Sequence, residues 1–453
     1  MSASNFEDMN VRELKKYCKE NGIKGISTLK KQDIINVVIQ HNTMEKECIN
    51  HSNSNHITDK NDCNNIKFID LFCGIGGFHL ALKELGCECV LACDIDKKCR
   101  ETYLKNFGIV PVPNVKDIDE KTIPDFDILC AGFPCQPFSN GGKKKSFDDD
   151  RGLLFDEIMR ISNYKKPKFM FLENVKHILK VSKGKVLEYI IEKIKQNGYV
   201  LQLFQVSPHK YGIPQQRERV FFVCVREDVY NGENIILDEK YQKISINDII
   251  KETDDKYLIP NDIKNVLDAW NELIKKFDTN EKISPTILIH DYFRTYTKDE
   301  YDNLPSWKKD YMSKNKPLLE KYKLIVTEWY KKNKDILSKR EIYGKLEWQV
   351  GKIKENDDIY NYFIQIRQSR IRIKKPNYFP TLVAISQIPI YGKTKSYISP
   401  RQCARLQSFP ETFILDKNDK VVYKQMGNSV NVSNVLMVIE STLKHYNLLK
   451  HSE

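Results

Sequence analysis

Long apolar runs are what this sequence lacks most clearly. No stretch approaches the roughly 20 residues that a membrane-crossing helix needs. The first ten residues also lack the apolar core of a secretory signal peptide. These absences argue against membrane and secreted proteins, so we expect a cytoplasmic protein, in a bacterium or in a virus-infected host cell.

Paired cysteine spacing is missing as well, although the chain has 12 cysteines. The cluster Cys87, Cys89, Cys93 and Cys99 contains no C-x-x-C pair, and it spans a predicted strand and helix. We therefore expect no zinc site there. A long chain without a signal peptide favours free thiols in a reducing compartment over a disulfide scaffold.

Basic residues outnumber acidic ones by 73 to 61, which gives a net charge of +12. This excess favours a polyanionic partner such as nucleic acid, although charge alone does not establish one. With 453 residues, the chain has room for two or three domains.

The most informative stretch is Gly-Phe-Pro-Cys-Gln-Pro-Phe-Ser at 132–139. The apolar residues 126–131 before it have the length of a buried strand. This strand would deliver Cys135 to the end of a sheet, on a loop stiffened by prolines. Such a place suits a nucleophile, whereas a lone cysteine in this setting is more often structural. The polar residues 141–151 that follow are either a lid over Cys135 or a surface loop.

A strand–turn–helix–strand pattern precedes this loop. Residues 67–72 predict a strand, 73–77 a glycine-rich turn, 78–85 a helix that ends at Gly86, and 88–92 a second strand. Asp94 follows the second strand, where a carboxylate can accept hydrogen bonds from ribose hydroxyls. The pattern predicts a nucleoside cofactor, but its spacing is not the G-x-G-x-x-G of NAD-binding proteins.

More strands are predicted at 169–172, 199–206 and 219–225. Glu-Asn-Val at 173–175 stands at the carboxyl end of the first, and Gln-Gln-Arg-Glu-Arg at 215–219 leads into the last. Strands alternating with helices from 66 to 225 predict an α/β fold with a doubly wound sheet.

The first 45 residues predict a small helical module. Asn10 would cap one helix and Thr28 a second, with Gly-Ile-Lys-Gly at 22–25 between them. The pattern resembles a SAP-type DNA-binding module, and a plain helical hairpin is an equal alternative. Residues 46–65 are polar and predict a linker.

The alternation stops at about 227 and returns after 378. All four tryptophans lie between these points, and residues 311–340 predict helix. Arg367, Arg370 and Arg372 lie in a stretch that favours an edge strand, whose cationic face either contacts phosphate or is solvated. Residues 400–410 predict a helix and turn, and Gly-Asn-Ser at 427–429 the start of the last helix.

Five motifs occur in a characteristic order: Asp70 to Gly77, Pro134-Cys135-Gln136, Glu173-Asn174-Val175, Gln215-x-Arg217-x-Arg219 and Gly427-Asn428-Ser429-Val430. In this combination the chain resembles the C5-cytosine DNA methyltransferases over residues 68–226 and 401–439. The resemblance implies an α/β, Rossmann-like fold that depends on S-adenosylmethionine. Together with the N-terminal pattern, it divides the chain into a helical module (1–45), a linker (46–65), a catalytic domain that binds S-adenosylmethionine (66–226), a target-recognition domain (227–395) and a C-terminal segment that returns to the catalytic domain (396–453).

The resemblance also implies a chemistry. C5 of cytosine is a poor nucleophile, and a thiolate from Cys135 that adds at C6 makes C5 carbanion-like. Glu173 would share or donate a proton at N3. Arg219 would hold the O2 edge of the base, supported by Arg217.

The cofactor-binding residues implied in the same way are Asp70, Phe72, Gly74, Gly76, Asp94, Ile95, Asp117, Pro134, Asn428 and Ser429. Phe72 and Ile95 would sandwich adenine, Asp94 would bind ribose hydroxyls and Asp117 would meet the adenine amino group. Ile95 stands where the family often has a larger apolar or aromatic side chain.

The implied function is sequence-specific methylation of a flipped-out cytosine in duplex DNA, with S-adenosylhomocysteine as product and no metal. The implied protein is a monomer of a restriction–modification or viral system, with a cognate restriction endonuclease as candidate partner. A tRNA cytosine-5 methyltransferase and a catalytically inactive DNA-binding homologue remain alternatives. One sequence does not reveal the DNA target.

Overall fold

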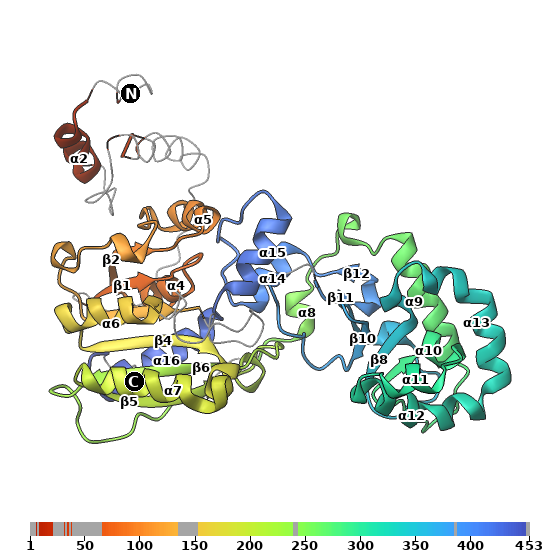
Figure 1. Cartoon of the computed structure of the whole chain (residues 1–453). Helices are drawn as coiled ribbons and strands as arrows, with labels where there is room; N and C mark the ends of the chain where they lie inside the picture. Colours follow the sequence, from red (N-terminus) through yellow and green to blue (C-terminus); the bar gives the residue numbers. More distant parts are fainter. Residues whose placement is uncertain are drawn as a thin grey trace. The chain divides into compact units, whose positions relative to one another are not determined.

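The structure is a computed structural model of the chain (Figure 1). It describes residues 66–134, 153–238, 243–384 and 387–449, and, before them, Phe6, 9–20, Lys31, Ile34, Ile35 and Val38. Two compact units are present. The first unit comprises residues 1–213, 217–243 and 404–453, and the second unit comprises 214–216 and 244–403.

The first unit contains a six-stranded sheet in the order β2-β1-β3-β4-β6-β5. Strands β1, β2, β3 and β4 are parallel, whereas β6 runs antiparallel to both β4 and β5. The central strands are continuous apolar runs because helices cover both faces of such a sheet. The strand bounds are Lys67–Leu71 (β1), Glu88–Cys93 (β2), Ile128–Gly132 (β3), Phe169–Val175 (β4), Tyr199–Val206 (β5) and Arg219–Arg226 (β6).

These strands confirm the predicted α/β fold. From residue 66 onward, the helices that lie wholly in this unit are α4 (Gly77–Glu84), α5 (Lys97–Phe107), α6 (Leu153–Lys165), α7 (Lys185–Gln196), α15 (Asp419–Asn428) and α16 (Val432–His445). Helix α16 packs against α4, which returns the C-terminal segment to the first βαβ unit. Short 3₁₀ turns occupy Val115–Asp117, Glu120–Thr122, Lys176–Gly184 and Pro208–Lys210.

The predicted start of the last helix is wrong. Gly427 and Asn428 belong to the end of α15, and the extended Ser429 (φ −68°, ψ 155°) follows them. Helix α16 begins at Val432 because the Asn431 side chain accepts the backbone N–H of Asn434 at 3.0 Å and so caps it.

Residues 227–238 belong to the first unit. The Gln202 side chain on β5 donates to the carbonyl of Ile235 at 2.8 Å and accepts its N–H at 2.9 Å. The backbone N–H of Asp238 donates to Ser441 on α16 at 2.9 Å. These bonds hold the segment on the first unit beyond the end of the last strand.

The second unit contains a sheet in the order β12-β11-β9-β10-β8-β7. Its strands are Thr286–Leu288 (β7), Lys345–Gln349 (β8), Phe363–Ile366 (β9), Ile371–Lys374 (β10), Ile390–Tyr391 (β11) and Ser396–Tyr397 (β12). Its helices are α8 (Ile246–Ile249), α9 (Asn261–Ile274), α10 (Ile289–Phe293), α11 (Lys298–Asp302), α12 (Ser306–Lys321) and α13 (Lys323–Ser338), and α14 (Pro400–Leu406) crosses into the first unit.

Tryptophans anchor the core of the second unit. The rings of Trp270 on α9 and Trp329 on α13 lie 5.1 Å apart, and both are buried. Their indole N–H groups donate to the carbonyls of Tyr343 and Ala269, each at 2.7 Å, so the polar edges are satisfied. The predicted helical region over residues 311–340 is confirmed by α12 and α13.

The prediction of an edge strand around Arg372 is wrong. Strand β10 lies between β9, to which it is antiparallel, and β8, to which it is parallel. The stretch does form a strand with alternating isoleucine and basic residues. Pairing with β8, which is distant in the sequence, places this strand inside the sheet.

At the N-terminus, α2 (Val11–Glu20) begins as predicted. Asn10 Oδ1 accepts the N–H groups of Arg12 and Glu13, both at 3.0 Å, and Glu13 accepts the Asn10 N–H at 2.8 Å. Thr28 and residues 46–65 lie outside the described residues.

Candidate active site

The glycine-rich turn after β1 is shaped by close packing. Phe72 and Gly74 both have φ +55°, and Gly76 has φ +90°. A Cβ on Gly76 would lie 2.2 Å from the ring of Phe107, so only glycine fits. A Cβ on Gly77 would lie 2.5 Å from Val430 Cγ2. The turn therefore lies tightly between α5 and the C-terminal segment.

Asp94, just after β2, fixes this turn. Its carboxylate accepts the N–H of Gly74 at 2.8 Å and the N–H of Asp96 at 2.7 Å. Burial raises the pKa of Asp94, and these two hydrogen bonds oppose the rise. Each carboxylate oxygen has a second lone pair, so Asp94 can also accept from a ligand hydroxyl.

Glu173 and Arg219 form an ion pair on neighbouring strands. Arg219 Nε lies 2.8 Å from Glu173 Oε1, and the side chains are 14% and 10% exposed. Burial raises the pKa of Glu173, while Arg219 and Arg217 oppose the rise. Strand register places Glu173 beside Gly132 at the carboxyl end of β3. This ion pair therefore lies next to the strand that leads to Cys135.

Asn174 holds the start of the cysteine loop. Its amide donates to the carbonyl of Phe133 at 3.0 Å. Pro134 is exposed and follows directly. Cys135 and residues 141–151, the nucleophile and lid of the sequence prediction, lie outside the described residues.

Arg217 joins the approach to β6 with the turn after α15. The side chain is almost fully buried, and its Nη2 donates to the carbonyls of Gly427 at 2.9 Å and Ser429 at 2.6 Å. Arg217 thus holds main chain in place rather than projecting its charge into solvent.

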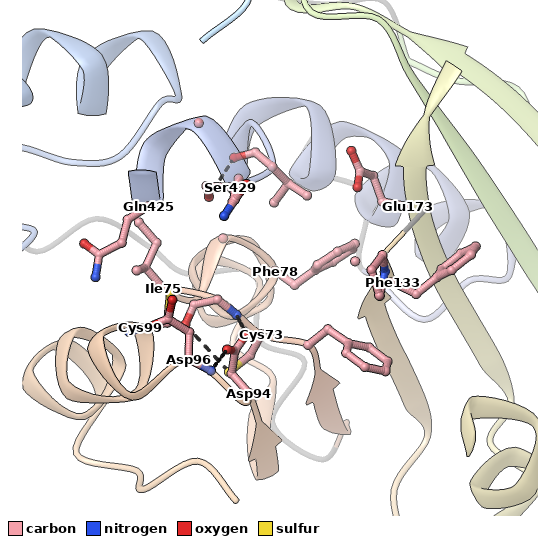
Figure 2. Close-up of a pocket in the computed structure, with 18 of the residues that line it drawn as sticks. Cys73, Ile75, Phe78, Asp94, Asp96, Cys99, Phe133, Glu173, Gln425 and Ser429 are labelled. Atoms are coloured by element: carbon pink, nitrogen blue, oxygen red, sulfur yellow. Dashed lines mark hydrogen bonds between the residues drawn. The ribbon is translucent and has the colours of Figure 1, made fainter. Parts of the chain in front are cut away.

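A cavity of about 470 Å³ brings these groups together (Figure 2). Figure 2 shows Asp94 and Asp96 on one side of it and Glu173 on the other, with Phe78 between them. The carboxyl ends of β3 and β4, the start of β6 and the glycine-rich turn after β1 therefore line one cavity.

Comparison with known proteins decides the family. Residues 66–445 match the family model described as C-5 cytosine-specific DNA methylase. The chain belongs to the C-5 cytosine-specific DNA methylases. Its activity is methylation of cytosine C5 in DNA, and the methyl donor of the family is S-adenosylmethionine.

Two bacterial relatives align with most of this methylase. Type II methyltransferase M.HhaI of Haemophilus parahaemolyticus is 32% identical over 374 residues, 83% of this chain and 93% of the relative. Type II methyltransferase M.BanI of Aneurinibacillus aneurinilyticus is 31% identical over 424 residues, 84% of this chain and 96% of the relative.

A solved structure confirms the fold alone. A prophage-encoded DNA modification methyltransferase of E. coli aligns with 84% of this methylase and 100% of its own chain, with a TM-score of 0.52 and 18% identity. At the other end of the methylase, residues 6–45 match the model of the Rho termination factor N-terminal domain. The SAP-type resemblance of this segment stays a prediction.

The cavity includes most of the site residues predicted from sequence. Those that line it are Phe72, Gly74, Asp94, Ile95, Pro134, Glu173, Arg217, Arg219, Asn428 and Ser429. Three others lie outside its lining. Asp70 is fully buried in β1, Gly76 packs on Phe107, and Asp117 ends a 3₁₀ turn.

The cavity also has lining residues that sequence reasoning did not single out as site residues. They include Gly77, Phe78, Asp96, Cys99, Asn174, Lys424 and Gln425. Lys424 Nζ lies 2.7 Å from Asp96 Oδ2, which links α15 to the N-terminus of α5. Asn174 had a signal in the sequence, because it stands in the Glu-Asn-Val motif. Lys424 precedes the Gly-Asn-Ser-Val motif by three residues, but it belongs to no motif itself.

Neither membrane helices nor metal clusters are found in the described parts of the methylase. No helix there has the length and apolar character to cross a membrane. No group of three or more His, Cys, Asp and Glu side chains there could hold a metal ion. The described cysteines are buried free thiols.

Proposed function

We propose that this methylase modifies a specific DNA sequence through a covalent adduct between Cys135 and C6 of a flipped-out cytosine. The observation that carries the proposal is the shared cavity, in which the Glu173–Arg219 pair faces the turn held by Asp94. An acid of raised pKa and a nucleoside-binding turn in one hollow suit a reaction between a base and a nucleoside cofactor.

S-adenosylmethionine fits the part of the cavity formed by the glycine-rich turn. Asp94 would accept the ribose hydroxyls, and Phe72 and Ile95 would contact the adenine. The Ile95 side chain is 80% exposed and lines the cavity, so it is free to cover a ligand. Gly74, Asn428, Ser429 and Pro134 would surround the methionine end. When bound, the cofactor supplies an electrophilic methyl group on its sulfonium.

Asp70 and Gly76 would act indirectly, because both lie behind the turn. Asp70 is fully buried, and its carboxylate faces the backbone N–H of His79. Burial, and then the neighbouring Asp94, raise its pKa well above the usual range. The role of Asp117 at the adenine amino group stays a prediction.

The protein residues would divide the reaction at cytosine between them. The Cys135 thiolate adds to C6, and Glu173 donates a proton to N3, which relieves the negative charge on the ring. C5 would then take the methyl group, whose bond to the sulfonium sulfur breaks and leaves S-adenosylhomocysteine. A base would remove the C5 proton, the C6–S bond would break to release the Cys135 thiolate, and N3 would return its proton to Glu173. Arg219 would hold O2, with Arg217 fixing the main chain behind it.

Base flipping is part of this proposal, and the burial of Glu173 supports it. Glu173 is buried in the cavity wall, and a base stacked inside a duplex cannot reach such a group. Target specificity and a role beside a restriction endonuclease are proposed because the relatives above are named Type II methyltransferases. We also propose that the methylase acts as a monomer in this role.

The test is methyl transfer from labelled S-adenosylmethionine to plasmid DNA, followed by bisulfite sequencing. We expect incorporation at one recurrent motif. If folded protein binds the cofactor but labels no DNA, the proposal fails, and tRNA becomes the next substrate to try.

A further inference from the structure

A row of polar side chains crosses the sheet of the second unit. Strand register pairs Glu347 on β8 with Thr286 on β7 and with Arg372 on β10. Arg372 in turn pairs with Gln365 on β9. Since side chains alternate along a strand, these residues share one face. The residues between them are part of the apolar core: Leu346, Trp348, Ile364, Ile371 and Ile373.

Glu347 is the centre of this row. Its Oε2 lies 3.0 Å from Nε of Arg372, 3.8 Å from Nε of Arg370 and 3.9 Å from Nη1 of Arg367. The Glu347 side chain is 8% exposed, whereas the three arginines are 22% to 33% exposed. One buried carboxylate therefore holds three guanidinium groups that reach solvent, and their positive charge exceeds its own.

Arg370 and Arg372 are held differently. Arg370 donates to Thr286 Oγ1 at 3.0 Å, and its guanidinium lies 5.7 Å from the centre of the Tyr311 ring. Arg372 donates to Glu347 through Nε. Across the described part of the chain, the two terminal nitrogens of Arg372 have no hydrogen-bond partner. Arg372 is thus fixed at its inner end and carries a free pair of donors at its outer end.

We propose that Arg372, positioned by Glu347, reads a guanine of the DNA target in the major groove. Two parallel donors on a guanidinium match O6 and N7 of guanine, and this is the commonest specific contact between proteins and bases. Prior fixation by Glu347 reduces the conformational entropy lost on binding. Arg367 and Arg370 add positive charge beside it. The inference rests on the proposed function in taking duplex DNA as the substrate.

A phosphate contact is the competing role for the same arginine. Phosphate contacts position a protein without reading sequence, so their loss weakens binding to all sequences equally and reduces its salt dependence. A base contact is lost selectively, for the sequences that contain the base.

The experiment replaces target guanines one at a time with 7-deazaguanine, which lacks the N7 acceptor. It measures DNA binding and methyl transfer by the full-length protein. We expect one replacement to weaken wild-type binding about 5- to 150-fold. Arg372→Gln should bind the ordinary target more weakly by a similar factor and show no further loss with 7-deazaguanine. Arg372→Lys should restore salt-dependent binding but not the preference for guanine.

Glu347→Gln tests positioning, because it keeps the shape of the side chain and removes its charge. It should reduce the preference for guanine over 7-deazaguanine and raise the KM for DNA more than it lowers kcat. Arg340→Gln is the matched control, because it removes the same charge from an exposed arginine of this unit whose guanidinium lies over the Tyr343 ring. It should keep the wild-type preference.

The inference is overturned if Arg372→Gln remains as sensitive to 7-deazaguanine as wild type, or if it loses affinity equally for all sequences. Selection of bound duplexes from a randomised pool separates this result from failure of the proposed function, because selection needs no methyl transfer. Wild-type protein that enriches a guanine-bearing site but transfers no methyl group would refute the proposed function alone.

Discussion

In the first unit Arg217 and Asp94 at the cavity bond to the main chain, whereas in the second unit Glu347 and Arg372 bond to each other. Arg217 donates to two carbonyls, and Asp94 accepts two backbone N–H groups. Glu347, in contrast, has three arginine side chains around it. A charge held by main chain has its position set by turns and strand ends, while a charge held by side chains can be rearranged by single substitutions.

This difference suits the two tasks that we propose. The chemistry at cytosine is the same for every target, so its groups need a rigid frame. Target reading must differ between enzymes of one family, and a face of exchangeable side chains allows this without a change of fold. The predictions below test the residues at the cavity of the first unit, and set them against the arginines around Glu347.

The largest effect is expected at the nucleophile. Cys135→Ser should lower methyl transfer by at least about three orders of magnitude, because a hydroxyl is far less nucleophilic than a thiolate. Cofactor binding, measured by calorimetry, should stay close to wild type. Cys403→Ala is the control, since this buried thiol on α14 does not line the cavity. Retained turnover in Cys135→Ser would exclude Cys135 as the nucleophile.

The next prediction compares Arg217, which bonds to the main chain, with Arg219, which pairs with Glu173. Arg217→Met should lower the free energy of unfolding by about 2–4 kcal/mol, because it leaves the buried carbonyls of Gly427 and Ser429 without their donor. Arg219→Met should destabilise the protein less than Arg217→Met, because Glu173 can take up a proton when its partner is lost, but it should lower kcat more. Denaturant titration followed by circular dichroism measures the first quantity. Equal destabilisation by both variants would contradict the distinction.

A smaller effect concerns pH. Burial raises the pKa of Glu173, and Arg219 opposes that rise. Arg219→Gln should therefore raise the pKa of Glu173 further, so that the carboxyl stays protonated to higher pH. The alkaline fall in kcat that reports loss of this proton should move upward in pH. A pH–rate profile at saturating cofactor and DNA measures it. A downward shift would show that Glu173 does not act as the acid.

The smallest effect is expected at the N-terminus. Deletion of residues 1–60 should leave methyl transfer to short duplexes near normal. It should weaken binding to long DNA by less than about tenfold, with a shallower salt dependence. Affinity measured against salt concentration for both lengths tests this. If affinity for long DNA does not change, the first 60 residues do not contribute to DNA binding.

Two features, Asp70 and the basic strand around Arg372, lie elsewhere in the fold than the sequence predicted. Asp70 and Asp94 belong to one βαβ unit and were both predicted to bind the cofactor, yet only Asp94 lines the cavity. Asp70 lies within β1, where the pleat turns its side chain into the fold and buries it fully. The alternating basic strand was recognised, but its position inside the sheet depends on pairing with β8, which comes from a distant part of the chain.

The sequence by itself determined the family, the order of the strands along the chain and most residues of the cavity. These features depend on local patterns: apolar runs, glycine turns and short motifs at strand ends. The tertiary structure alone decided three features: the burial of Asp70, the bond from Lys424 to Asp96, and the gathering of Arg367, Arg370 and Arg372 around Glu347. Each depends on residues far apart in the chain, whose distances are set only when strands pair and helices pack.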